Sequence, residues 1–499
     1  MIYVIFEQIN MSDMSQTKEL QTKRDNELSD WRKQEQSALE LLKIVGDLRF
    51  DKGIELVLFR RDIYDSRPSE VLHDHKIARN YIDQDISIST TLAIAREIRS
   101  RKDLNPVKID IGKMAAELES NPNLQLGDFV EDCINNLAGD SGKSIEARDV
   151  VLYGFGRIGR LLARRIISTT GRGDQLLLKA IVLRGKMKSV EEELEKRAAL
   201  LLSDSVHGDF QGTVTVDSEN SSIIVNGNHI NFIFSDRPDT IDYNDYGIRD
   251  AVLIDNTGVW RDKEGLSQHL RPGISHVILT APGKDIVNIV YGANQDQSDT
   301  ENIVSAASCT TNAIVPIIKT VDGAFGIEKG HIETIHAYTS DQNLLDNFHK
   351  KPRRGRAAAL NMVLTTTGAA KAVSRVLPHL KGVLTGNAVR VPTPNVSLAI
   401  MNFHLKGQTN LKELNHLLRD ASLEGDFMEQ IHYSTDTEYV STSAVGMTST
   451  SVVDSPSNIV SEDGKSAMVY AWYDNEFGYC CQVVRLAKHI AKVRRPRFY

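Results

Sequence analysis

The chain has 499 residues, enough for about three domains, and its hydrophobic fraction of 41% and charged fraction of 25% are ordinary for a globular protein. Its net charge of −7 argues against a general role on nucleic acid or on a membrane surface, and its four cysteines, none at zinc-site spacing, fit a reducing compartment. Since no apolar run approaches the roughly 20 residues of a membrane span, we predict a cytoplasmic protein without a metal, nucleic-acid or membrane partner.

The first 147 residues carry helical patterns but no chemical motif. Residues 1–28, charged and polar after a short apolar start, predict a disordered lead-in. Apolar residues from Ala38 to Leu48 then recur at helical spacing, whereas residues 53–59 fit a strand or a buried helix equally well. We predict residues 29–147 as a mainly helical module with its own small core. Its paired charges favour a solvated face over a binding patch, and its role is left open.

A strand, a glycine turn and a helix follow one another after residue 148. Val150–Tyr153 is an apolar strand, and Arg160–Ile167 has a helical pattern. Between them stands a six-residue motif: Gly154, Phe155, Gly156, Arg157, Ile158 and Gly159. In this context glycines permit the tight turn, the close approach of a pyrophosphate and close packing of the helix on the strand. The stretch therefore predicts a dinucleotide site rather than a purely structural turn.

We interpret residues 148–308 as a dinucleotide-binding domain of the Rossmann type, completed by a C-terminal helix at residues 478–499. Another predicted strand, Val252–Asp255, ends in a short turn that contains Thr257 and Gly258. Strand ends are where ligands bind in open α/β sheets, so both turn residues are candidate cofactor contacts.

The end of the second predicted strand, Leu176–Leu183, bears on the choice of cofactor. An acidic residue at this place would bind the ribose hydroxyls of NAD, but the strand continues into Arg184. A carboxylate would repel a 2′-phosphate, whereas Arg184, Lys186 and Lys188 would attract one. We therefore favour NADP over NAD as the cofactor. The alternative is a solvated basic loop on an NAD-dependent enzyme.

Cys309 stands at the predicted start of a helix. Ser308 is a good N-cap, and apolar residues after the cysteine recur at helical intervals. Unpaired backbone N–H groups and the helix dipole favour an anion there, so we expect the thiol to ionise more easily than a free one. Such a thiolate is a candidate nucleophile, although cysteine is also a common small core residue. Pro316 lies inside the same helix and predicts a kink beyond its first turns.

Residues 309–477 predict a second domain, of α+β class with an antiparallel sheet. Ile332–Thr339 reads as a strand that contains His336, and residues 383–391 and 396–405 read as two antiparallel strands. A lone histidine on a strand is more often structural than catalytic. Another helix opens at Thr367 and Gly368, and its N-terminus suits a phosphate.

Four motifs taken together resemble phosphorylating glyceraldehyde-3-phosphate dehydrogenase. They are the glycine motif at 154–159, Ser-Cys-Thr-Thr-Asn at 308–312, His-Ala-Tyr-Thr at 336–339 and Arg-Val-Pro-Thr-Pro-Asn-Val-Ser at 390–397. The resemblance runs from about residue 148 to the end, and the N-terminal portion has no counterpart in the ordinary enzyme.

The resemblance implies that Cys309 is the nucleophile and His336 its base. The Cys309 thiolate would attack the aldehyde to form a hemithioacetal, and His336 would take the hydroxyl proton as hydride leaves for the nicotinamide. Inorganic phosphate would then cleave the resulting thioester to an acyl phosphate. Like other members of the family, the chain would form a homotetramer.

The resemblance also implies two anion sites and a cofactor contact. The substrate phosphate would bind Thr339, Asp341 and Arg390. Inorganic phosphate would bind Ser308, Thr310, Thr367 and Gly368. Asn475 would hold the nicotinamide carboxamide and so select the face that receives hydride. For each hydroxyl the alternative role is a helix cap or a turn.

Two alternatives stay open at this point. Erythrose-4-phosphate dehydrogenase is a relative with the same nucleophile and base, but it lacks the His-Ala-Tyr-Thr and Thr-Thr-Gly elements found here. A protein of another class would keep the scaffold for binding or regulation and act through the N-terminal module. A protein that no longer catalyses a reaction would not need to keep Cys309, His336, Arg390 and Asn475 together, so the presence of all four favours an enzyme.

Overall fold

The computed structural model describes residues 2–82, 84–102, 104–121, 123–138 and 145–498, with the backbone alone for residues 2–17, 80, 81 and 136–138. The chain forms two compact units. Unit 1 consists of Met1–Lys143 together with Arg495–Tyr499, and unit 2 consists of Ser144–Arg494. Residues 139–144, near the end of the predicted helical module, fall outside the described residues. Among the helices described, none is long and apolar enough to cross a membrane.

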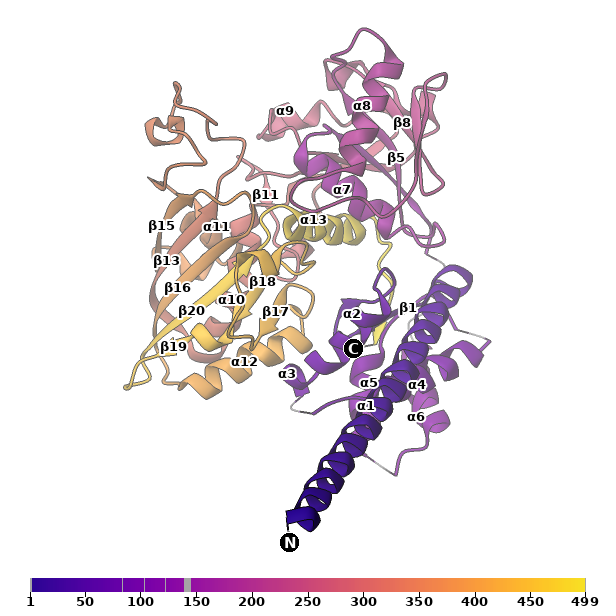
Figure 1. Ribbon diagram of the computed structural model, residues 1–499. Helices are drawn as coiled ribbons and strands as arrows, with labels where there is room; N and C mark the ends of the chain where they lie inside the picture. The colour runs from indigo at the N-terminus through magenta and orange to yellow at the C-terminus, as the bar shows by residue number, and fades with distance from the viewer. Residues whose placement is uncertain (1, 83, 103, 122, 139–144, 499) are drawn as a thin grey trace. The chain divides into compact units, whose positions relative to one another are not determined.

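Unit 1 is mainly helical, as predicted, and also contains a small sheet (Figure 1). Its helices are α1 (Ile2–Asp47), which ends in a π-helical turn at Leu48–Lys52, α2 (Pro68–Ile77), α3 (Arg79–Ile82), α4 (Ile88–Ser100), α5 (Ile111–Ser120) and α6 (Leu126–Ala138). Its strands are β1 (Glu55–Leu58), β2 (Arg61–Asp62), β3 (Lys108–Asp110) and β21 (Arg497–Phe498), in the order β2-β1-β3-β21.

Two predictions about the ends of the chain are corrected by these elements. Residues 18–28 are helical within α1, although their polar composition predicted disorder. Helix propagates readily from a formed segment, and α1 is anchored by the buried residues from Ala38 to Val45. At the other end, the closing helix α13 spans Phe477–Ile490 rather than 478–499, and the last residues form β21, which pairs with β3 of unit 1.

The sheet of unit 1 is fastened at the end of β3. The buried Asp110 carboxylate accepts hydrogen bonds from the backbone N–H groups of Phe59 (2.9 Å) and Gly112 (3.0 Å), and it pairs with the guanidinium of Arg60. Because this buried carboxylate accepts hydrogen bonds from several donors, it fixes the positions of β1, β3 and the start of α5 relative to one another. The C-terminal strand is held in the same way, because buried Arg495 pairs with Glu55 of β1.

The first sheet of unit 2 is the predicted Rossmann-type sheet. Its order is β11-β12-β10-β9-β4-β5-β8-β7-β6, parallel from β11 to β8 and antiparallel beyond. The strands are β4 (Arg148–Tyr153), β5 (Leu176–Leu183), β6 (Val214–Asp217), β7 (Ser222–Val225), β8 (Asn228–Phe234), β9 (Ala251–Asp255), β10 (Ile274–Leu279), β11 (Val287–Asn288) and β12 (Ile303–Ser305). The helices that follow its strands are α7 (Arg157–Ser168), α8 (Val190–Leu202) and α9 (Lys263–Ser267).

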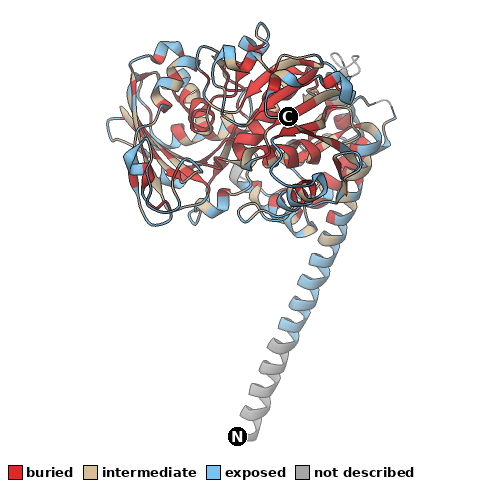
Figure 2. Cartoon of the chain, turned by 90° about the horizontal axis from the view of Figure 1, so that it is seen from above, coloured by how far each residue is buried: buried red, intermediate tan, exposed pale blue. Residues whose placement is uncertain are grey.

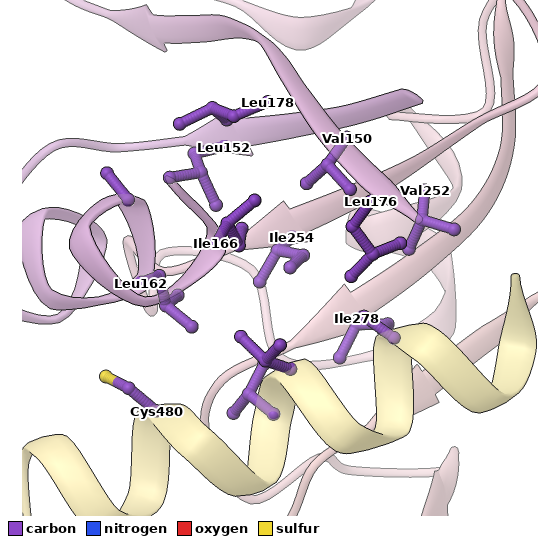
Figure 3. Close-up of a cluster of buried hydrophobic side chains, with 14 of the residues drawn as sticks. Val150, Leu152, Leu162, Ile166, Leu176, Leu178, Val252, Ile254, Ile278 and Cys480 are labelled. Atoms are coloured by element: carbon purple, nitrogen blue, oxygen red, sulfur yellow. The ribbon is translucent and has the colours of Figure 1, made fainter. Parts of the chain in front are cut away.

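Apolar side chains fill both faces of this sheet. Figure 3 shows one face, where Val150, Leu152 and Ile254 of the sheet face Leu162 of α7 and Cys480 of α13. All five side chains are at most 1% exposed. The C-terminal helix α13 thus completes the core of the nucleotide-binding sheet, although it follows the second sheet in sequence.

The second sheet of unit 2 is mainly antiparallel, in the order β14-β15-β13-β16-β20-β18-β17, with β19 pairing β20. Its strands are β13 (Ile327–Ala337), β14 (Val363–Thr365), β15 (Leu384–Val391), β16 (Ser397–Leu405), β17 (Ile431–Ser434), β18 (Ser451–Asp454), β19 (Ile459–Val460) and β20 (Ser466–Tyr473). Its helices are α10 (Cys309–Phe325), α11 (Ala369–Val376) and α12 (Leu411–Leu423). The strands predicted as an antiparallel pair, β15 and β16, do not pair; they flank β13, with β15 parallel to it and β16 antiparallel.

Candidate active site

The glycine motif lies where the strand order of the first sheet reverses. Strand β4 has β5 on one side and β9 on the other, so the loops after β4 and β9 emerge side by side at the carboxyl ends of their strands. Gly154 has a φ of +102°, which glycine alone adopts readily. A Cβ on Gly159 would lie 2.5 Å from the Gly154 carbonyl oxygen, so the third glycine is needed for close packing. No atom lies within 4 Å of a Cβ built on Gly156, and that side of the turn is open.

Asn256, directly after β9, is not among the predicted site residues, although it lies in the same turn as Thr257 and Gly258. Its Oδ1 atom lies 2.7 Å from the Cβ position of Gly159, is buried, and has no hydrogen-bond partner among the described residues. A buried acceptor left unsatisfied is costly, which fits an atom that receives a donor when a ligand is bound. Thr257 and Gly258 continue this turn, with the Thr257 hydroxyl bonded to Asp255 (2.7 Å) and Gly258 at a φ of +66°.

The other predicted cofactor residues take different positions. The Phe155 side chain is buried in the core, and Ile158 packs on the same core. The Arg157 guanidinium pairs with Asp204 (2.8 Å) and Glu476, so its side chain is occupied by an ion-pair cluster. Arg184 is exposed at the end of β5, 3.7 Å from a carboxylate oxygen of Asp236.

The thiol of Cys309 is held at the start of α10. The Ser308 side chain caps this helix by accepting the N–H of Thr311 (3.1 Å), as predicted. Cys309 Sγ lies 3.7 Å from His336 Nε2, and the residue keeps partial access to solvent.

The predicted easier ionisation of Cys309 is wrong. Burial raises the pKa of the Cys309 thiol, and the charge of Arg390 and the hydrogen bonds from Thr310 offset this only in part. The backbone amides at the helix start favour the thiolate, but the loss of water around the sulfur disfavours it more strongly, and the local sequence does not show this loss.

His336 is poised as a neutral acceptor. Its Nδ1 lies 2.7 Å from the carbonyl oxygen of Ala337, so Nδ1 carries the proton and donates to that oxygen. Nε2 is then unprotonated and faces the Cys309 thiol. Burial, followed by the positive charge of Arg390, lowers the pKa of His336 to about 3. Thiol and imidazole are therefore both neutral at pH 7, and the thiol proton has an acceptor within reach.

Arg390 lies beside the Cys309–His336 pair because β15 runs parallel to β13 and places Arg390 opposite His336. Its Nη1 donates to the carbonyl oxygen of Ala337 (2.8 Å), the same oxygen that receives Nδ1 of His336, and to the hydroxyl of Thr339 (3.3 Å). Its Nε is buried and has no partner among the described residues. A buried cation with a free N–H group suits an anionic ligand.

The predicted hydroxyls near Cys309 all have partners within the protein. Thr310 is buried and its hydroxyl lies 3.0 Å from the Tyr473 hydroxyl. The Thr367 hydroxyl accepts the N–H of Ala369 (3.1 Å), and Gly368 is the N-cap of α11. Tyr473 also packs edge-on against the His336 ring, at a centroid distance of 5.9 Å. Sequence reasoning missed Tyr473, whose only signal was its place in an apolar strand.

Asp341 is paired before any ligand arrives. Its carboxylate binds the guanidinium of Arg354, which is buried and also donates to Thr365 (3.2 Å). Arg354 comes from the basic segment Lys350–Arg356, and the sequence did not distinguish this inward-facing arginine from its exposed neighbours. Its charge also contributes to the low pKa of His336.

Asn475 is held at the junction of the two sheets of unit 2. Its Oδ1 accepts a hydrogen bond from the hydroxyl of Ser397 (2.9 Å) at the start of β16. The neighbouring Asp474 binds His207 (3.0 Å) and Asn395 (2.9 Å), so polar side chains fasten this turn from three directions. The side-chain amide nitrogen of Asn475 remains available as a donor, since no hydrogen bond of it occurs among the described residues.

Comparison with known families identifies two consecutive matches. The family model described as the NAD binding domain of glyceraldehyde 3-phosphate dehydrogenase matches residues 148–263, and the one described as the C-terminal domain of the same enzyme matches residues 308–475. Together they contain the glycine motif, the cysteine, the histidine, the arginine and the asparagine described above.

Individual relatives agree with this match. Glyceraldehyde-3-phosphate dehydrogenase 2 of Bacillus subtilis is 41% identical over 351 residues, which cover 70% of this chain and 98% of that protein. The glyceraldehyde-3-phosphate dehydrogenase of Priestia megaterium is 39% identical over 343 residues, covering 68% and 97%. A glyceraldehyde-3-phosphate dehydrogenase-like protein of Pseudomonas aeruginosa is 48% identical over 465 residues, covering 92% of this chain and all of that protein. Because that alignment leaves only 8% of the chain uncovered, it includes most of unit 1.

Proposed function

The chain belongs to the glyceraldehyde 3-phosphate dehydrogenase family, and from this premise we propose that it is a phosphorylating glyceraldehyde-3-phosphate dehydrogenase. It would oxidise D-glyceraldehyde 3-phosphate with inorganic phosphate and NAD(P) to 1,3-bisphosphoglycerate, reversibly. One observation carries the proposal: the Cys309 sulfur faces the unprotonated nitrogen of His336, and Arg390 stands beside both.

The proposed chemistry follows from the neutral state of this pair. As the sulfur of Cys309 attacks the aldehyde carbon, its proton passes to Nε2 of His336, and the sulfur–carbon bond of the hemithioacetal forms. The Ala337 carbonyl, which accepts from Nδ1, would stabilise the imidazolium, and the backbone N–H of Cys309 would stabilise the developing oxyanion. Loss of the C–H hydride of the hemithioacetal to the bound cofactor would give a thioester, while the proton stays on His336. Attack of phosphate on this thioester would then release the sulfur, which recovers that proton from the imidazolium.

The residues present fit a nicotinamide dinucleotide. Gly154, Gly156 and Gly159 allow a pyrophosphate to approach the start of α7, Asn256 offers an unsatisfied acceptor, and Asn475 offers a donor for the carboxamide. The bound cofactor would supply the hydride acceptor.

For the substrate phosphates we propose the sites implied by the family. Arg390 has a free N–H group and reaches the Thr339 hydroxyl, which supports a place for the substrate's own phosphate. Ser308, Thr310, Thr367 and Gly368 would bind inorganic phosphate, with Thr310 exchanging its bond to Tyr473 for one to the ligand.

The mechanism is tested with the purified full chain. Cys309→Ala should abolish phosphate-dependent reduction of NAD(P), and Cys481→Ala, which removes a buried thiol of α13, should leave it unchanged. A near wild-type rate in Cys309→Ala would refute the mechanism. Comparing kcat/KM for glyceraldehyde 3-phosphate and erythrose 4-phosphate decides between the two aldehydes.

We propose NADP as the preferred cofactor. A carboxylate directly after β5 would exclude a 2′-phosphate, but this chain has Arg184 there. The ion pair of Arg184 with Asp236 is weak because both side chains are exposed. Arg184→Ala should raise KM for NADP about tenfold, the loss of one charge-assisted contact, and leave KM for NAD unchanged. Arg172→Ala, just before the same strand, is the matched control. A wild-type preference for NAD would contradict the proposal.

We also propose a homotetramer in the cytoplasm. The segment after His336 exposes large apolar side chains, namely Leu344, Leu345, Phe348, Leu360 and Met362, which suggests that a neighbouring subunit covers them. All four cysteines are free, as in a reducing compartment. Light scattering on the purified chain tests the assembly, and a monomer at all concentrations would contradict it.

A further inference from the structure

Helix α1 carries an apolar stripe that no described residue covers. Leu20, Leu28, Trp31 and Leu39 are 57, 55, 51 and 54% exposed, and at 3.6 residues per turn they fall within an arc of about 100°. Residues 18–34 of α1 are all exposed, and Figure 2 shows a long exposed stretch of this helix. Of the residues that anchor α1 in unit 1, Leu41 and Ile44 lie on another side of the helix, whereas Ala38 and Val45 lie at one edge of the stripe, and all four are at most 1% exposed. The stripe is therefore additional to the core of unit 1.

The spacing of the apolar residues in this stripe is symmetric about its centre. Its apolar residues are separated by eight, three and eight positions, so Leu20 and Leu39 are equally far from the midpoint between Ser29 and Asp30, as are Leu28 and Trp31. Two charged residues on the same face complete the symmetry: Arg24 and Glu35 are also equidistant from this midpoint and have opposite signs. Neither makes an ion pair within the described part of the chain.

Such a face is complementary to itself. If two α1 helices pair antiparallel about a two-fold axis at this midpoint, Leu28 of one copy lies level with Trp31 of the other. Arg24 then lies level with Glu35 of the second copy on both sides of the centre, and Leu20 lies level with Leu39 at each end. A parallel pairing in register would instead place Arg24 against Arg24 and Glu35 against Glu35, which is repulsive.

We propose that α1 is a dimerisation helix, whose partner is the α1 helix of a second copy of this chain in antiparallel orientation. The contact buries four large apolar side chains per copy, with Trp31 as the main anchor. The two reciprocal Arg24–Glu35 pairs select the antiparallel orientation and the register. This assembly is independent of the catalytic chemistry and of the proposed tetramer, because it uses only residues of unit 1.

Cross-linking of single cysteines in the full chain tests both pairing and orientation. With a rise of 1.5 Å per residue, the two Leu28 positions are offset along the helix axis by roughly 4.5 Å and the two Leu39 positions by roughly 28 Å. A short bismaleimide should therefore link Leu28→Cys chains into a covalent dimer and leave Leu39→Cys chains unlinked. Because native Cys309 is partly accessible to solvent, both variants are made in a Cys309→Ser background. That background chain, whose Cys133, Cys480 and Cys481 are buried, is the control for native thiols. Links at both positions would show parallel pairing, and no link at Leu28→Cys would show no pairing; either result overturns the proposal.

A charge exchange in the Leu28→Cys background distinguishes self-pairing from binding of any other partner. Arg24→Glu and Glu35→Arg should each lower the yield of linked dimer at least fivefold, because each places like charges level with one another. The double variant Arg24→Glu/Glu35→Arg restores opposite charges between copies and should recover most of the yield. Within one helix these residues are 11 positions apart and cannot compensate each other. Failure of the double variant to recover, with helical content unchanged by circular dichroism, would refute the antiparallel register.

Discussion

Arg390 should control the protonation of His336, and its removal gives a measurable pKa shift. Both side chains donate to one acceptor: the Ala337 carbonyl oxygen lies 2.7 Å from Nδ1 of His336 and 2.8 Å from Nη1 of Arg390. The two nitrogens are thus no more than about 5.5 Å apart, and at an effective dielectric constant of about 20 two unit charges at this distance repel by about 3 kcal/mol. That energy corresponds to about two pKa units.

The sign follows from the charges. Arg390 disfavours the imidazolium form, so the variant Arg390→Leu should raise the pKa of His336 from about 3 to about 5. Burial, the larger cause of the low value, remains in the variant, so the pKa should not return to the usual value near 6.5. The same change removes a charge that favours the thiolate, so the pKa of Cys309 should rise further.

Hydrogen–deuterium exchange at the imidazole C2 carbon, followed by mass spectrometry of the His336 peptide, measures this pKa. Above about pH 4 the wild-type exchange rate should be flat, and Arg390→Leu should show a titration near pH 5. Arg356→Gln, which removes an exposed guanidinium paired with Asp346, is the control and should match the wild type. If Arg390→Leu shows no titration above pH 4, burial alone sets the pKa and the electrostatic reasoning is refuted.

Three further predictions, which use four substitutions, test the site. His336→Asn should lower kcat by about 10²–10⁴ and abolish the pre-steady-state burst, since the Cys309 thiol loses its acceptor; an unchanged burst would assign the proton to another group. Gly159→Ala should lower the free energy of unfolding by about 1–3 kcal/mol, measured by calorimetry, because its Cβ meets a carbonyl oxygen. Gly156→Ala should keep wild-type stability but weaken cofactor binding, which a fluorescence titration measures. Ser308→Ala removes the cap of α10 and should cost about 1 kcal/mol of stability, and a neutral effect in scanning calorimetry would mean that packing alone holds the helix start.

Local patterns were enough to predict the elements that hold the candidate site. The helix begins at Cys309 with Ser308 as its cap, the glycine turn follows an apolar strand, and His336 lies on a strand. Each of these features is specified by residues within a few positions of one another.

Features that depend on distant parts of the chain were missed. Tyr473 reaches Thr310 from 163 positions away, and Arg354 turns inward only because Asp341 and Thr365 receive it. The sign of the Cys309 pKa shift has the same origin, because the elements that remove water from the sulfur are remote in sequence. Strand pairing is equally non-local, so neither the separation of β15 from β16 nor the two-residue strand β21 could be read from periodicity.

Because β21 pairs with β3, the sheet of unit 1 can be completed only late in the synthesis of the chain. The sheet of unit 1 lacks its edge strand until the last residues of the chain have left the ribosome, by which time all of unit 2 has been made. Until then β3 presents unpaired backbone groups, and Glu55 lacks its buried arginine partner. A fragment ending at residue 143, or a chain shortened by its last five residues, would be left permanently in that unfinished state. A tag inserted directly after Phe498 would extend from a strand of unit 1.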